Sequence, residues 1–122
     1  MLCIIKKDKH MATILLTEDN NELRATFAEI LTLEGYEIIE ASDGADAVEK
    51  LKTQAASIDL IMCDYAMPNM NGLEVLAFAR RNPTTENIPF IILSGVHPPE
   101  TEDEHIFVSK PVDIEELLKL LA

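Results

Sequence analysis

Short apolar runs alternate along the chain with longer segments in which apolar residues recur at helical spacing. The runs are at residues 14–16, 38–39, 60–62, 90–93 and 106–108, and each predicts a strand. Most are apolar at consecutive positions, as expected for strands that are covered on both faces. This alternation predicts repeated βα units around a parallel sheet, with helices on both faces.

The ends of the helical segments carry capping signals. The first segment has apolar residues at i, i+4, i+7 and i+8 from Leu23, begins after Asn20 and ends at Gly35. Two further segments follow Gly44 and Gly72, and the last follows Asp113 and has acidic residues in its first turn. Residues 96–104 contain two prolines and four acids without an apolar stripe, so we expect a loop or a single helical turn there.

The length of 122 residues suits a single domain. We interpret residues 1–11 as a cloning remnant or a flexible tail and residues 12–122 as the domain. The 22 acidic and 10 basic residues give a net charge of −12, which disfavours nucleic acid and anionic membranes as partners. No apolar run approaches the roughly 20 residues of a membrane span, and the two cysteines form no disulfide or metal pattern, so we expect a cytoplasmic protein.

Polar residues follow four of the five predicted strands, where ligands bind in open parallel sheets. Glu18 and Asp19 follow the first strand, Asp64 the third, Ser94 the fourth and Lys110 the fifth. Three carboxylates at about 4 Å and an effective dielectric constant of about 20 would repel by about 4 kcal/mol per pair, so the site must protonate or bind a cation. Oxygen ligands favour Mg²⁺. A carboxylate beside Mg²⁺ and a lysine is suited to attack phosphorus, which predicts phosphoryl transfer to Asp64.

The same strand ends carry motifs that resemble the receiver domain of bacterial response regulators. The motifs are Glu18-Asp19, Asp64-Tyr65-Ala66-Met67-Pro68 with Gly72, Ser94-Gly95 and Lys110-Pro111. The resemblance covers residues 13–122 and implies a doubly wound, five-stranded parallel sheet of order 2-1-3-4-5. A receiver has its fourth helix between the last two strands. Because residues 96–104 contain two prolines and no apolar stripe, we expect that helix to be shortened or absent here.

The resemblance also implies roles for individual residues. Asp64 would accept a phosphoryl group from a histidine kinase or phosphotransfer protein. The ligands of Mg²⁺ would be Asp19, Asp64 and the backbone carbonyl of Ala66, with Glu18 acting mainly through water. The chain would catalyse only its own phosphorylation and dephosphorylation, and would signal by binding an unknown downstream protein.

Three further residues complete the implied site. Lys110 would contact the phosphoryl group, and Pro111 would support a cis peptide bond that aims this lysine. Ser94 and Phe107 would form a switch pair in which the ring moves inward as the hydroxyl turns toward the phosphate. Ala66 and Val96, two residues beyond Asp64 and Ser94, cannot orient a water molecule, so we expect slow loss of the phosphoryl group.

Other functions fit the sequence less well. A degenerate receiver that acts as an interaction module without phosphorylation would not need the full set of chemical groups present here. A magnesium-dependent phosphatase with an aspartate nucleophile needs a second aspartate two residues after Asp64, where Ala66 stands. A flavin mononucleotide carrier would need a phosphate-binding loop after the first strand, where Glu18 and Asp19 would repel phosphate.

Overall fold

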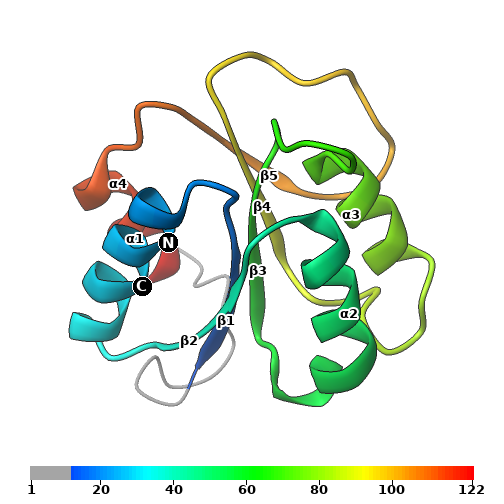
Figure 1. The fold of residues 1–122 in the computed structure, drawn as a ribbon, viewed down its shortest axis with the longest axis horizontal. Coiled ribbons are helices and arrows are strands. Elements are labelled where there is room, and N and C mark those ends of the chain that lie inside the picture. The colour runs from blue at the N-terminus through cyan, green and yellow to red at the C-terminus, as the bar shows by residue number, and fades with distance from the viewer. Residues whose placement is uncertain (1–11) are drawn as a thin grey trace.

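The computed structural model describes residues 12–122, so the interpretation of residues 1–11 lies outside the described part of the chain. Strands and helices alternate, as the sequence predicts (Figure 1). The elements are β1 (Thr13–Thr17), α1 (Asn21–Leu33), β2 (Glu37–Ala41), α2 (Gly44–Gln54), the 3₁₀ turn η2 (Ala55–Ser57), β3 (Leu60–Asp64), α3 (Gly72–Arg80), β4 (Phe90–Ser94), β5 (Ile106–Ser109) and α4 (Ile114–Leu121).

The five strands form one parallel sheet of order β2-β1-β3-β4-β5, which confirms the predicted topology. The central strands β1, β3 and β4 are buried along their whole length, as their consecutive apolar residues require. Because all strands run in the same direction, their carboxyl ends lie at one edge of the sheet. That edge holds the candidate site.

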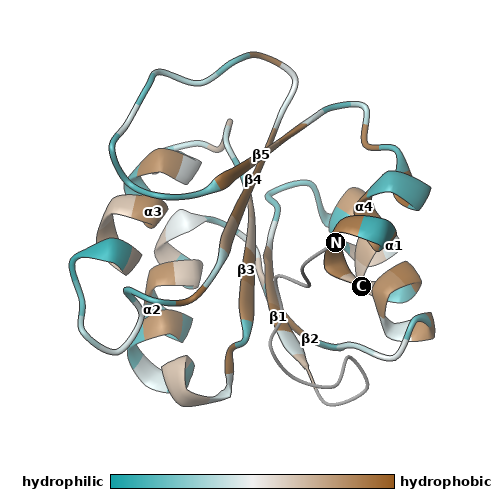
Figure 2. Ribbon diagram, turned by 180° about the vertical axis from the view of Figure 1, so that it is seen from behind, coloured by the Kyte–Doolittle hydropathy of each residue, from teal (hydrophilic) through white to brown (hydrophobic). Residues whose placement is uncertain are grey.

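The helices cover the sheet from both sides and form two apolar cores. One core joins the sheet to α1 and α4 and includes Leu16, Phe27 and Leu117. The other joins it to α2 and α3 and includes Leu51 and Leu76. In Figure 2 the hydrophobic residues follow the strands and the inner faces of the helices. None of the helices in residues 12–122 has the length and hydropathy needed to span a membrane.

Capping side chains begin the helices where the sequence predicts. Asn20, Asp43, Asn71 and Asp113 each accept a hydrogen bond from a backbone N–H in the first turn of α1, α2, α3 and α4. Gly35 has a φ of 102°, a conformation in which glycine avoids the strain of a side chain, and it reverses the chain after α1.

The connection between β4 and β5 contains no helix. This confirms the prediction that the helix which a receiver has at this place is shortened or absent. This loop, residues 95–105, bends out beside α3 in both ribbon views (Figures 1 and 2). Two arginines at the end of α3 hold it there. Arg80 donates to the backbone carbonyl of Glu104 at 2.9 and 3.1 Å, and Arg81 pairs with Asp103 at 2.7 Å.

Candidate functional site

The carboxyl edge of the sheet brings together the polar residues that the sequence places after its strands. Glu18 and Asp19 follow β1, Asp64 ends β3, Ser94 ends β4 and Lys110 follows β5. Glu18, Asp64 and Ser94 are buried, with relative exposures of 3%, 4% and 3%, whereas Asp19 is exposed. The site therefore has a buried floor of two carboxylates and a hydroxyl, and a third carboxylate at its mouth.

The three carboxylates form a compact cluster. Glu18, Asp19 and Asp64 each offer an oxygen, and these oxygens lie within 4.8 Å of one another. Negative charges at this separation repel, and burial of two of them removes the water that would screen them. Carboxylate oxygens are the donors that Mg²⁺ prefers, so the donor set fits this ion. The role of the Ala66 carbonyl as a further ligand stays a prediction.

Lys110 supplies a cation to this cluster. Its ammonium forms an ion pair with Asp64 and lies 3.3 Å from Oε1 of Glu18. The peptide bond between Lys110 and Pro111 is cis, as the resemblance implied. The backbone N–H of Lys110 also donates to the carbonyl of Ser94, which fixes the residue against the end of β4.

The electrostatics of the site follow from burial and from this ion pair. Burial raises the pKa of Asp64, although the hydrogen bond and charge of Lys110 oppose the rise. Burial also raises the pKa of Glu18, with a further contribution from the charge of Asp64. For Lys110, burial alone would lower the pKa, but Asp64 and Glu18 outweigh it and raise the pKa. Ionising the two buried acids therefore costs free energy, and a second cation would stabilise their ionised form.

The turn after β3 holds the backbone of Asp64 in place. Gly72, the first residue of α3, donates its N–H to the carbonyl of Tyr65 at 2.9 Å. A Cβ at Gly72 would lie 2.7 Å from the backbone oxygen of Asp64 and 3.0 Å from Cα of Tyr65. Only glycine therefore allows α3 to begin this close to the end of β3.

A comparison with protein-family models matches residues 14–122 to the response regulator receiver domain. The chain belongs to this family. Receiver domains are the regulated modules of two-component systems.

Relatives of this receiver domain occur in longer signalling proteins and as separate domains. It is 33% identical to the CAI-1 autoinducer sensor kinase/phosphatase CqsS of Vibrio cholerae, over 97% of this chain but only 18% of CqsS. It is 29% identical to the chemotaxis protein CheY of Treponema pallidum, over 89% of this chain and 79% of CheY. The chain thus spans less than a fifth of the length of CqsS.

A solved structure agrees with the fold. The crystal structure of the Vibrio cholerae chemotaxis protein CheY4 matches with a TM-score of 0.81 and 30% identity, and the match covers 91% of this chain and 96% of CheY4.

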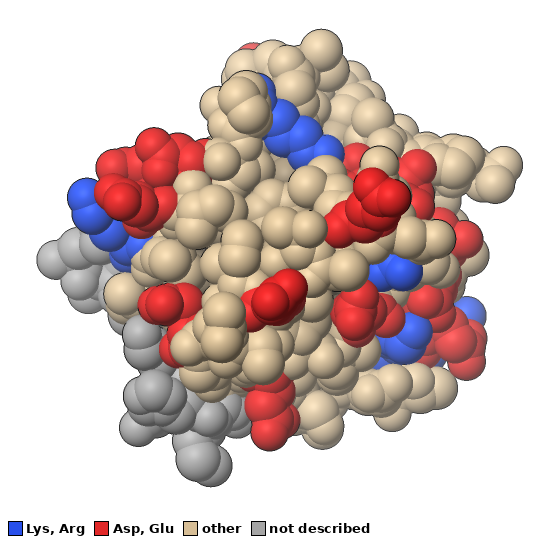
Figure 3. Space-filling view, turned by 60° about the vertical axis from the view of Figure 1, so that its left-hand side comes forward, with Lys and Arg blue, Asp and Glu red and all other residues tan. Residues whose placement is uncertain are grey.

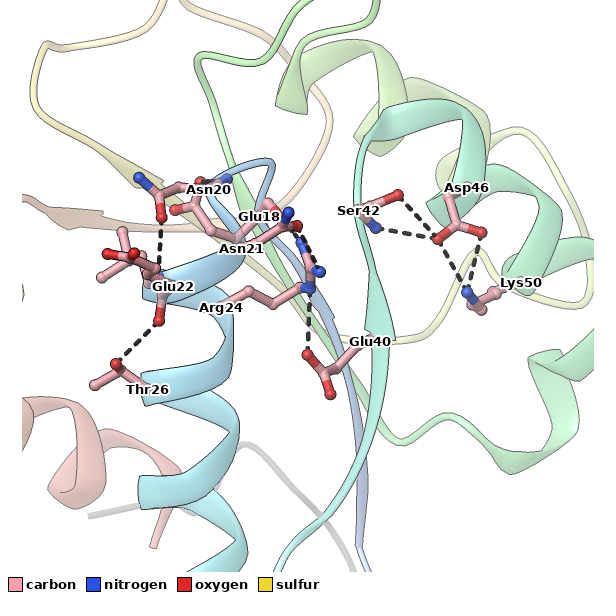
Figure 4. Close-up of polar contacts among 11 residues, drawn as sticks. Glu18, Asn20, Asn21, Glu22, Arg24, Thr26, Glu40, Ser42, Asp46 and Lys50 are labelled. Carbon is pink, nitrogen blue, oxygen red and sulfur yellow. Dashed lines mark hydrogen bonds and ion pairs between the residues drawn. The ribbon is translucent and has the colours of Figure 1, made fainter.

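One residue that supports the acidic cluster was missed by the sequence analysis. Arg24, on the first turns of α1, donates to the backbone carbonyl of Glu18 at 2.7 Å (Figure 4). The same guanidinium donates to Asn21 at 2.9 Å and pairs with Glu40 of β2 at 3.2 Å. Its side chain is only 15% exposed. Arg24 therefore ties the β1–α1 loop of the receiver domain, which carries two of the carboxylates, to β2.

The proposed switch pair lies at the end of β4 and on β5. The Ser94 hydroxyl donates to the backbone carbonyl of Val96 and accepts from the Val96 N–H, so its hydrogen bonds stay within its own turn. The Phe107 ring is half-buried and stacks on His97 of the 95–105 loop, with ring centroids 5.0 Å apart and an interplanar angle of 25°. The structure thus connects Phe107 to the loop that follows Ser94, and the switch role stays a prediction.

Proposed function

We propose that this receiver domain accepts a phosphoryl group on Asp64 in a magnesium-dependent reaction and signals by binding another protein. One observation carries the proposal: the buried carboxylate of Asp64 is ion-paired with Lys110 and belongs to a cluster of three carboxylates. A buried acid of this kind, poised beside a cation, is the arrangement that a phosphoryl acceptor needs.

The transfer step follows from these contacts. An Asp64 carboxylate oxygen attacks phosphorus, and an O–P bond forms as the bond between phosphorus and the leaving group breaks. The leaving group, an imidazole of a phosphohistidine or the carboxylate of an acyl phosphate, departs with the electron pair. A Mg²⁺ held by Glu18, Asp19 and Asp64 would supply positive charge to the phosphoryl oxygens. Lys110 moves its hydrogen bond from Asp64 to the incoming phosphoryl group.

The relatives support a histidine kinase or a phosphotransfer protein as the donor. CqsS is named a sensor kinase/phosphatase, and a hybrid signal transduction histidine kinase of Dictyostelium discoideum is 33% identical over 86% of this chain. The receiver would then act only on its own aspartate and on no separate substrate. The downstream protein is unidentified, and the cytoplasmic location stays a prediction.

The alternatives are less well supported by the site. Ala66 stands where a phosphatase of the aspartate-nucleophile class needs its general acid, and it carries no ionisable group. A receiver that worked without phosphorylation would have no need to keep Lys110 beside two buried acids, because an unneeded buried ion pair is readily replaced by apolar residues.

The proposal is tested by intact-mass spectrometry. The chain is incubated with acetyl phosphate and MgCl₂, beside Asp64→Asn and beside Glu49→Gln, which changes an exposed acid on α2. The unmutated chain and Glu49→Gln should each gain the mass of one phosphoryl group, and Asp64→Asn should gain none. Equal gain by Asp64→Asn, or no gain by the unmutated chain with either acetyl phosphate or a phosphorylated histidine donor, would reject the proposal.

A further inference from the structure

The loop between β3 and α3 carries the backbone carbonyl of Ala66, the predicted backbone ligand of Mg²⁺. A hydrogen bond of 2.9 Å from the N–H of Gly72 to the carbonyl of Tyr65 joins the two ends of this loop. Between these ends Ala66 and Asn69 are exposed, whereas Met67 is buried in the core that joins the sheet to α2 and α3. A backbone carbonyl has no side-chain rotamer that could aim it, so the conformation of the loop decides where this ligand points.

A tight turn at Asn69 bends the middle of the loop. The N–H of Met70 donates to the carbonyl of Pro68 at 2.8 Å, and Asn69 between them has a φ of 70°. A hydrogen bond that spans one residue of positive φ defines a γ-turn of the strained kind, which is rare in proteins. Among residues 12–122, Asn69 is the only residue other than glycine with a positive φ. Such strain persists only where the surrounding structure enforces it.

Gly44, the first residue of α2, packs against this turn. A Cβ on Gly44 would lie 2.8 Å from Cβ, 2.9 Å from Cγ and 2.9 Å from the carbonyl oxygen of Met70, so a side chain there would displace either Met70 or α2. On its other side Met70 directly precedes Asn71, which begins α3 through reciprocal hydrogen bonds with Glu74 at 3.0 and 3.1 Å. The turn is thus held between the first residues of two helices, and these contacts enforce its strain.

The overall charge of the protein does not by itself direct a divalent cation to this loop. The net charge is −12, and acidic side chains are spread over the side of the molecule where α1 and α4 lie (Figure 3), so the field attracts cations to many parts of the surface. The site differs from the rest of the surface in its local geometry. A carbonyl that is already in place adds to the affinity at little cost, whereas ordering a loop during binding costs conformational entropy.

We propose that Asn69 and Gly44 are positioning residues of the Mg²⁺ site. Gly44 allows α2 to hold the strained turn at Asn69, and the turn keeps the Ala66 carbonyl in place before an ion binds. Neither residue is a ligand, and both act through the backbone of the loop. The inference rests on the magnesium-dependent function proposed above, and it adds that part of the affinity for Mg²⁺ comes from a helix that supplies no ligand.

Calorimetric titration with Mg²⁺ tests the role of Asn69 in variants that keep the net charge. Asn69→Val places a branched side chain at a positive φ and disfavours the turn, whereas Asn69→Gly keeps the turn because glycine adopts a positive φ without strain. Asn87→Val is the matched control, at an exposed asparagine outside the loop. The Kd for Mg²⁺ should rise about tenfold in Asn69→Val and stay close to that of the unmutated chain in Asn69→Gly and Asn87→Val.

Two variants test the contact with α2, and thermal unfolding is recorded for both. Gly44→Ala adds the Cβ that would displace Met70, and Met70→Ala removes the Cγ that lies against Gly44. Each should raise the Kd for Mg²⁺ in the folded chain. If Gly44→Ala does not fold, Met70→Ala decides, and an unchanged Kd in Met70→Ala overturns the role of Gly44.

Amide hydrogen exchange of the metal-free chain measures the turn without Mg²⁺. The Met70 amide should exchange about tenfold faster in Asn69→Val than in the unmutated chain, whereas the Leu15 amide of β1 should not change. Equal Mg²⁺ affinity in Asn69→Val and the unmutated chain, or an equal loss in Asn69→Val and Asn69→Gly, would overturn the proposal and leave the proposed function standing. An unmutated chain that binds no Mg²⁺ would overturn both.

Discussion

Replacing Lys110 by methionine removes the cation that, among residues 12–122, forms ion pairs with the two buried carboxylates. At 3.3 Å from Glu18 and an effective dielectric constant of about 20, the attraction to this one acid is about 5 kcal/mol. The lysine side chain is 27% exposed and loses hydration in the site, so the net contribution is smaller. We expect Lys110→Met to lower the free energy of unfolding by about 2–3 kcal/mol near neutral pH without Mg²⁺.

The loss of stability in Lys110→Met should depend on pH in a defined direction. The pKa values of Asp64 and Glu18 are raised in the folded chain, so the ionised acids weaken the fold and their protonation strengthens it. As pH falls from about 8 toward these raised pKa values, the difference in free energy of unfolding between Lys110→Met and the unmutated chain should shrink. The pKa of Lys110 is raised, so in the unmutated chain its contribution is complete below the ordinary lysine pKa of about 10.4 and is lost as pH rises through the folded value.

Urea denaturation measures this effect, with Lys119→Met as the matched control. Lys119 is 69% exposed and pairs with Glu116 at 3.6 Å, so its loss should change stability little. At about pH 8 the midpoint of Lys110→Met should fall by roughly 1–3 M urea, and Mg²⁺ or a lower pH should restore part of it. Equal losses of stability in Lys110→Met and Lys119→Met would refute the electrostatic account of the site. A loss of stability in Lys110→Met that changes with neither pH nor Mg²⁺ would also refute it.

Three further predictions concern the backbone, the support and the lifetime of the site. Gly72→Ala should destabilise the fold by about 1–3 kcal/mol in thermal unfolding, because its Cβ would meet the Asp64 carbonyl. Gly95→Ala is the control and should be close to neutral, because its Cβ would meet nothing within 4 Å. Similar losses of stability in both variants would contradict the steric reason. Arg24→Gln should weaken Mg²⁺ binding about tenfold in a calorimetric titration, and unchanged affinity would show that Arg24 does not position Glu18. Ala66→Asn should shorten the lifetime of the phosphorylated chain about tenfold, because an amide can orient water where a methyl group cannot, and an unchanged decay of the intact-mass signal would reject that reason.

The strands and the main site residues were predictable because each depends on local sequence. A buried parallel strand must be apolar at consecutive positions, as β3 and β4 are, and the residue at its carboxyl end then lies at the ligand-binding edge. Asp64 and Ser94 were found in this way. The buried face of α3 was harder to predict, because this short helix is rich in apolar residues and only part of them, Val75, Leu76 and Ala79, are buried.

The contacts that were missed involve partners without a sequence signature. Arg24 binds a backbone carbonyl, which every residue offers, and Arg80 likewise binds the carbonyl of Glu104. The one available signal was charge, because the basic pair at the end of α3 precedes an acidic loop. The stacking of His97 on Phe107 joins residues from a loop without regular structure, and no periodicity predicts where such a loop folds back.

The most direct test of the central claim is chemical localisation of the phosphoryl group. After reaction with acetyl phosphate and Mg²⁺, borohydride reduces an aspartyl phosphate to homoserine, which tandem mass spectrometry locates in the sequence. The account predicts homoserine at position 64 and at no other acidic position, and none when Mg²⁺ or acetyl phosphate is omitted. Homoserine at Asp19 or at another acid, with position 64 unmodified, would contradict it.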